Sequence, residues 1–164
     1  MSTLFAPPGT EWTSVSPRLT SARRVALVLG LTPLAAGLAL LVVLAPFLPR
    51  WVYAVALGAV VAFLVFWWFW IAVLVRRWRY AERDEDLYVR NGALFRTLVA
   101  VPYGRMQYVD VSSGPVDRHF GIATISLHTA APGTSAVIPG LPADEAARLR
   151  DRLTELGGAQ GSGL

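Results

Sequence analysis

Two long runs without a charged residue constrain this chain more than any other feature of its sequence. The first runs from Val25 to Leu48 and the second from Trp51 to Val75, which makes 24 and 25 residues. At about 1.5 Å per residue each run forms a helix of about 36 Å, enough to cross a hydrocarbon core of about 30 Å. Uncharged runs of this length are rare in a soluble chain of 164 residues. The sequence therefore predicts a membrane protein with a two-helix transmembrane hairpin.

Arginines predict how this hairpin lies in the membrane. A short turn, residues 48–51, separates the two runs, so the helices must be antiparallel neighbours. One arginine, Arg50, lies in the turn, and seven flank the opposite ends of the runs: Arg18, Arg23, Arg24, Arg76, Arg77, Arg79 and Arg83. Because basic residues favour the cytoplasmic side of a membrane, we expect a multi-pass protein of the cytoplasmic (cell) membrane with both termini in the cytoplasm.

Basic and aromatic side chains are expected to contact lipid headgroups at both interfaces. A basic side chain near an anionic leaflet contributes about 1 kcal/mol, and indole rings favour the interface. The residues expected there are Arg23, Arg24, Arg76, Arg77, Arg79, Trp51 and Trp78. Trp67, Trp68 and Trp70 lie deeper in the second run. Their indole rings either reach the edge of the headgroup layer or serve as large apolar side chains that face the lipid tails. Membrane lipids are therefore the first expected partner.

The net charge of +4 does not indicate a nucleic-acid-binding protein. All 15 basic residues are arginines, and residues 1–80 carry seven of them with a single acid, Glu11, for +6. Residues 81–164 carry eight arginines and ten acids, for −2, so the two halves sum to +4. Nucleic-acid binding needs a basic patch on a folded domain, and here the excess arginines lie beside the apolar runs. We expect no nucleic-acid partner.

The residues that most catalytic and metal sites require are scarce. The chain has no cysteine and two histidines, His119 and His128, which excludes thiolate and polyhistidine metal sites. Asp117, His119 and the serine pair 112–113 are close in sequence, but a catalytic triad depends on geometry rather than on nearness in the chain. No glycine-rich phosphate loop or zinc-protease motif is present. We therefore expect no enzyme activity, no cofactor, no metal and no small-molecule substrate.

The second half of the chain changes to the alternating pattern of β-strands. Asn91-Gly92 predicts a two-residue type I′ turn, between a strand that ends at Arg90 and one that runs from Ala93 to Val101. Further strands are expected over residues 80–82, 106–111, 122–129 and 136–138. In the third of these, Ile125 and Leu127 alternate with polar residues and so face inward.

An amphipathic helix is expected to close this domain. It begins at Pro142, ends at Gly157 and buries one face made of Ala146, Leu149, Leu153 and Leu156. Residues 1–22 are rich in Pro, Ser and Thr, a composition typical of disorder. The predicted organisation is a disordered cytoplasmic tail (1–22), the transmembrane hairpin (23–79, with helices at about 25–48 and 51–75), a cytoplasmic domain (80–157) and a flexible tail (158–164).

Three sequence motifs follow one another in the second half of the chain, and their order is more specific than any one of them alone. They are Tyr80-x6-Leu87-Tyr88-Val89-Arg90-Asn91-Gly92, then Val101-Pro102-Tyr103-Gly104-Arg105-Met106-Gln107-Tyr108-Val109, then Gly114-Pro115-Val116-Asp117-Arg118-His119-Phe120-Gly121-Ile122-Ala123-Thr124-Ile125. From about Arg76 to Leu156 the chain resembles the bacterial PH-like (pleckstrin-homology-like) membrane-flanked family. The resemblance implies an α + β membrane protein: a two-helix transmembrane hairpin followed by a small PH-like antiparallel β split barrel with a C-terminal capping helix. It implies no catalytic residues.

Two functions remain open for such a chain. The first is a non-enzymatic, membrane-anchored PH-like interaction module, an accessory or scaffold subunit at the cytoplasmic face that binds another membrane protein. The second is a lipid-headgroup sensor of the inner leaflet. Arg105 and Arg118 recur in the family-like motifs, and we expect them either to anchor loops through backbone carbonyls or to bind the anion of a ligand.

Overall fold

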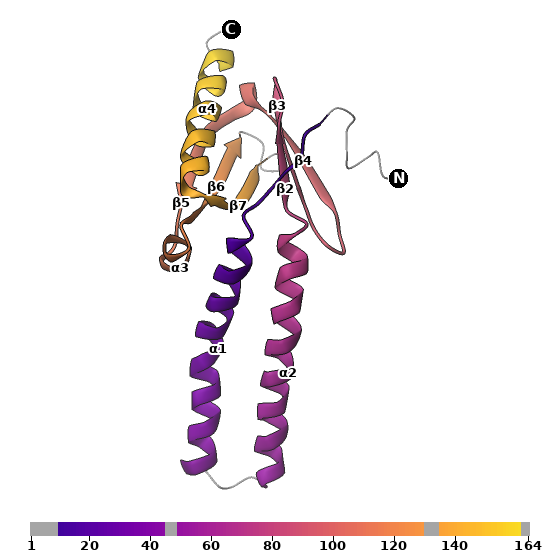
Figure 1. Cartoon of the computed structure of the whole chain (residues 1–164), viewed down its shortest axis with the longest axis vertical. Coiled ribbons are helices and arrows are strands. Elements are labelled where there is room, and N and C mark those ends of the chain that lie inside the picture. The colour runs from indigo at the N-terminus through magenta and orange to yellow at the C-terminus, as the bar shows by residue number, and fades with distance from the viewer. Residues whose placement is uncertain (1–9, 45–48, 130–134, 162–164) are drawn as a thin grey trace.

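A long helical hairpin carries a mixed α + β domain at one end (Figure 1). The computed structural model describes residues 10–44, 49–129 and 135–161. Helix α1 spans Arg18–Leu44 and helix α2 spans Arg50–Val75. Both are long and apolar enough to cross a membrane, as the two uncharged runs predict. The predicted end of the first helix, residues 45–48, lies outside the described residues.

Two small antiparallel sheets and a helix make up the domain. The first sheet has the order β1-β2-β3-β4, with β1 at Thr13–Ser14, β2 at Arg79–Glu82, β3 at Asp86–Asn91 and β4 at Thr97–Pro102. The second has the order β5-β6-β7, with β5 at Met106–Ser112, β6 at Ile122–Thr129 and β7 at Ala136–Pro142. A 3-10 turn at Tyr103–Arg105 joins the two sheets, a short helix α3 at Pro115–His119 follows β5, and α4 spans Ala143–Gly161. This arrangement confirms the predicted fold class.

One face of α4 closes the domain core. Ala146, Leu149 and Leu153 on this helix are at most 1% exposed, and Ile125 and Leu127 of β6 are equally buried. These are the faces that helical and strand periodicity predict. The amphipathic helix therefore covers the second sheet, as expected.

The core does not stop at the domain but continues into the helical hairpin. Val15, Leu19 and Ala22, at the start of α1 and just before it, are at most 6% exposed. Ile71 and Val75, in the last turns of α2, belong to the same buried cluster. The prediction of a disordered tail is therefore wrong for residues 13–22, because their apolar residues cover a part of the domain core that the rest of the chain leaves open.

An ionic network fixes α4 to the strand that follows the hairpin. The Arg148 guanidinium lies 2.6 Å from carboxylate oxygens of both Glu82 in β2 and Glu145 in α4. The Tyr80 hydroxyl donates a hydrogen bond to Glu145 at 3.1 Å. Hydrogen bonding from Arg148 lowers the pKa of Glu145, and burial, followed by the Glu145 charge, raises that of Tyr80. The capping helix is thus tied to the segment that leaves α2.

Three local predictions need correction. The β3–β4 connection is a five-residue loop, 92–96, rather than a two-residue turn, because the last pair joins Asn91 to Thr97. Helix α4 runs through Gly157 to Gly161, so the tail from residue 158 is helical as far as the description extends. Strand β7 extends to Pro142, so the helix begins one residue later than predicted.

Gly140 offers a direct test of the junction between hairpin and domain. It adopts a φ of +70°, and a Cβ there would lie 2.6 Å from Cβ of Leu19 in α1. We expect Gly140→Ala to lower the free energy of unfolding by about 1–3 kcal/mol through overpacking, in addition to the strain of the positive φ. Thermal unfolding of the purified full chain, with protease sensitivity of the domain as the readout at each temperature, would measure this loss.

Gly121→Ala is the matched control for that substitution. Gly121 also has a positive φ, +64°, but its nearest neighbouring atom would lie 3.6 Å from the new Cβ. This variant therefore carries the backbone strain without the collision. Equal destabilisation by the two substitutions would contradict close packing of α1 against β7.

Candidate membrane-interface site

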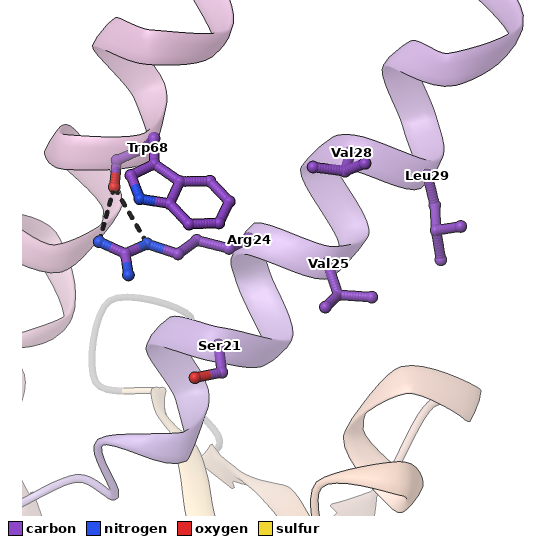
Figure 2. A pocket seen from close by; sticks show the side chains of 6 residues that line it. All are labelled: Ser21, Arg24, Val25, Val28, Leu29 and Trp68. Carbon is purple, nitrogen blue, oxygen red and sulfur yellow. Dashed lines mark hydrogen bonds between the residues drawn. The ribbon is translucent and has the colours of Figure 1, made fainter.

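Arg24 and Trp68 pair across the two helices near the domain (Figure 2). The Arg24 Nε and Nη2 atoms donate hydrogen bonds to the Trp68 carbonyl oxygen at 3.2 and 3.1 Å. The guanidinium carbon also lies 4.5 Å from the centroid of the Trp68 ring, a cation–π distance. A charged group can remain beside apolar surface when its donors are satisfied in this way. Arg24 therefore marks the depth of the last charged side chain in α1 before the uncharged run begins at Val25.

Helix length gives the same depth for the membrane boundary. Twenty helical residues span about 30 Å, the thickness of the hydrocarbon core, and twenty residues counted from Trp51 end at Trp70. Trp51 is 67% exposed at the opposite end of α2, where the outer interface is expected. By this length, Trp67, Trp68 and Trp70 lie near the domain-side end of a span of about 30 Å, and Trp67 also packs against the domain core.

A cleft of about 670 Å³ with a mixed polar and apolar lining lies between the helices on the domain side of this boundary. Arg24, Arg76 and Arg79 line it together with Ser14 and Thr20. An apolar groove of about 300 Å³ adjoins it and shares Arg24 and Ser21 with it. The groove continues along α1 past Val25, Val28 and Leu29 (Figure 2). The cleft offers positive charge to an anion, and the adjoining groove offers apolar surface along α1.

A second group of arginines surrounds Arg79. The register pairs Arg79 of β2 directly with Arg90 of β3. Burial, followed by the charges of Arg79, Arg96 and Arg77, lowers the pKa of Arg90. The Arg90 guanidinium also lies 5.0 Å from the centroid of the Trp12 ring. Arg90 and Arg96 are not among the residues predicted for the membrane interface, and the β2–β3 register is the signal that brings Arg90 beside Arg79.

The remaining predicted residues lie at separate places. Arg23 is exposed on α1, and Trp78 is half-buried against the domain core. Arg105 lies in the 3-10 turn that follows β4, at the end of the first sheet away from the hairpin, whereas Arg118 lies in α3 beside α1 (Figure 1). The fold therefore does not bring Arg105 and Arg118 together. Both are exposed, and within the described residues neither side chain donates a hydrogen bond.

The two histidines have ordinary aromatic neighbours. His128 stacks on Tyr108 with ring centroids 4.3 Å apart, and His119 meets Phe120 edge-on at 5.3 Å. Across the described ranges, no three His, Cys, Asp or Glu side chains gather as a candidate metal site. The arginine-lined cleft is a polar feature to which both helices and the first sheet contribute.

Comparison with known proteins agrees with this architecture. The family model of the bacterial PH domain matches residues 24–157, which include both the hairpin and the sheets. The UPF0699 transmembrane protein YdbS of Bacillus subtilis (strain 168) is 39% identical over 79 residues, which cover 48% of this chain and 48% of YdbS. The similarity thus spans about half the length of that relative, and no solved structure matches the chain. The family model thus covers the transmembrane hairpin, the two small sheets and most of the capping helix. The chain therefore belongs to the bacterial PH domain family.

Proposed function

We propose that this protein is a non-enzymatic, membrane-anchored interaction module that binds another membrane protein at the cytoplasmic face of the cell membrane. Its hairpin already holds the domain at the membrane, so binding to lipid is not needed to bring the domain there. The core shared by α1, α2 and the sheets supports this proposal. A domain fixed in this way presents its surfaces at a constant height and angle, which suits an accessory or scaffold subunit.

The edge strand β4 is the observation that carries this proposal. Within the described residues, β4 pairs with β3 along one side only. Edge strands are commonly protected from further pairing by charged residues or an internal proline, but Thr97–Pro102 contains no charged residue and has proline at its last position. An extended segment of a partner can add to such an edge through main-chain hydrogen bonds.

The orientation of the hairpin is the first prediction from this proposal. Reporter domains fused to the N-terminus and to the C-terminus should both report a cytoplasmic location, because arginines flank the domain end of both helices. Reversing the charge of Arg76, Arg77 and Arg79 together should disturb that orientation. An external C-terminus in the unmodified protein would contradict the arginine argument.

Leu98→Lys combined with Ala100→Lys tests the edge strand. Leu98 is half-buried and Ala100 is exposed, and they alternate with the core-facing Val99 and Val101. Full-length protein extracted in mild detergent should retain a membrane protein in stoichiometric amount, and the double variant should lose it. Thermal unfolding of the double variant should stay close to that of the wild type.

Ala147→Lys combined with Thr154→Lys provides the control for added charge. Both residues are exposed on α4, away from β4. This control should retain the partner in wild-type amount. Equal retention by the edge variant, or the absence of any stoichiometric partner of the wild type, would contradict the proposed module.

Lipid-headgroup sensing is the second candidate function, and the arginine-lined cleft favours it. Three arginines, Arg24, Arg76 and Arg79, are among the residues that line this one cleft. Each basic group near an anionic leaflet contributes about 1 kcal/mol. Such a cleft attracts any anionic headgroup, whereas sensing requires that it prefers one of them.

The lipids that co-purify with the double variant Arg76→Gln, Arg79→Gln distinguish general attraction of anionic lipids from sensing of one headgroup. We expect the wild-type protein, extracted from mixed vesicles, to retain phosphatidylglycerol and phosphatidylserine equally and above their share of the bilayer. The double variant should lose this enrichment, and so should raised salt, which screens exposed charges over about 8–10 Å. Arg105→Gln, far from the cleft, is the control. Strong preference for one headgroup, lost in the double variant, would make sensing the better account.

A further inference from the structure

Two large apolar side chains are exposed at the tip of the β3–β4 loop. Leu94 is 77% exposed and Phe95 is 87% exposed, more than any other large hydrophobic residue in the described part of the chain, the hairpin included. Neither belongs to the core or packs against it. Leaving both side chains in water costs free energy that a polar loop would avoid. Folding of the domain therefore gives no reason for these residue types.

The backbone of this loop has a defined shape. Gly92 adopts a φ of +101°, a conformation that other residues rarely take. A Cβ at Gly92 would collide with the carbonyl oxygen of Phe95, so the chain turns back closely on itself. The tight turn carries Leu94 and Phe95 away from the sheet. Their exposure follows from the loop's geometry.

Strand register directs this loop toward the membrane. Strand β2 begins at Arg79, four residues after α2 ends at Val75, and runs away from the hairpin. Because β3 is antiparallel to β2 and pairs Arg90 with Arg79, its chain returns toward the helices. Residues 92–96 follow Asn91 and so extend beyond Arg79 on the hairpin side. Figure 1 shows the β3–β4 hairpin with its turn toward the domain ends of the helices.

Positive charge surrounds the base of the loop. Arg77 and Arg79 follow α2 in the chain. Arg90 is the second-last residue of β3, and Arg96 is the last residue of the loop. The register pairs Arg90 directly with Arg79, and the charges of Arg77, Arg79 and Arg96 all lower the pKa of Arg90. An apolar tip with a basic rim matches the interfacial layer of an anionic leaflet, where apolar groups reach the acyl boundary and cations meet phosphates.

We propose that the loop of residues 92–96 inserts Leu94 and Phe95 into the interfacial layer of the membrane that the hairpin spans. The occupant of this apolar tip is the lipid surface, because the chain's own helices hold that surface on the side to which the loop points. The contact would give the first sheet a second attachment to the bilayer, beside α2, and fix its tilt. This inference requires only that the hairpin spans the membrane, so it stands apart from the proposed protein partner.

The absence of cysteine from the chain allows a clean measurement of depth. Phe95→Cys, in the full-length protein, would carry a single environment-sensitive fluorophore after reconstitution into vesicles of phosphatidylcholine and phosphatidylglycerol. Tyr108→Cys is the matched control, because Tyr108 is an exposed aromatic residue, 57% accessible, on the second sheet. Leu94→Cys provides an independent label on the same loop if the label at position 95 disturbs the fold.

Lipid quenching distinguishes the possible outcomes. We expect blue-shifted emission at positions 95 and 94, and strong quenching by lipids that carry a spin label near the headgroup, with neither effect at position 108. Water-like emission at both loop positions would overturn the proposal. A label that is shielded from water but not quenched by lipid would also overturn it, and would assign the tip to contact between copies of the chain.

The basic rim gives a second readout of the same contact. Quenching at position 95 should weaken when phosphatidylglycerol is left out of the vesicles, and Arg77→Gln combined with Arg96→Gln should weaken it in the mixed vesicles. Arg105→Gln, at the other end of the first sheet, should leave it unchanged. Equal quenching in all these samples would show that the arginines do not contribute to the insertion.

Discussion

One buried cluster that joins both helices to the sheets is the interaction on which the rest of the structure depends. Leu19 and Ala22 of α1 and Ile71 and Val75 of α2 belong to it together with the domain core. A PH-like domain joined to a membrane helix by a flexible linker could take any orientation. Here the helices end as part of the core that the sheets cover, so hairpin and domain form one packed unit. The arginines, the open strand edge and the exposed loop consequently keep fixed heights relative to the bilayer.

This packing also shortens the part of each helix that faces hydrocarbon. Ile71 and Val75 read as membrane residues in the sequence, yet they are buried against the domain. Arg24 lies inside α1 rather than before it, where Trp68 accepts its hydrogen bonds. Each helix therefore has a membrane segment of about 20 residues and a further turn or two that belong to the domain. The apolar runs are longer than a bilayer needs because they serve both environments.

Sequence patterns predicted the elements whose neighbours are close in the chain or repeat with a regular period. Helical spacing of Leu149 and Leu153 and alternation of Ile125 and Leu127 identified buried faces correctly. The patterns failed where a distant contact decides the structure. Val15 and Leu19 read as part of a polar tail because the surface that they cover comes from β7 and α2, far along the chain. Asn91-Gly92 predicted a two-residue turn, but the chain pairs again only at Thr97. The exposed apolar loop, which also carries Arg96, depends on that longer connection.

The direct pairing of Arg79 with Arg90 concentrates positive charge at one place in a domain whose net charge is negative. Like charges opposite one another across two strands destabilise a sheet in water, and Arg77 and Arg96 add to the repulsion. The domain half of the chain is negative overall, with eight arginines against ten acids, so the average charge predicts no attraction to anionic lipid. Its acids Glu82 and Glu145 are engaged by Arg148 on the side that α4 covers, whereas the four arginines collect beside the end of α2. An anionic leaflet at that height would offset their mutual repulsion. The proposed membrane contact would relieve this repulsion at the position where the hairpin holds the arginines, so it depends on the strand register that pairs Arg79 with Arg90.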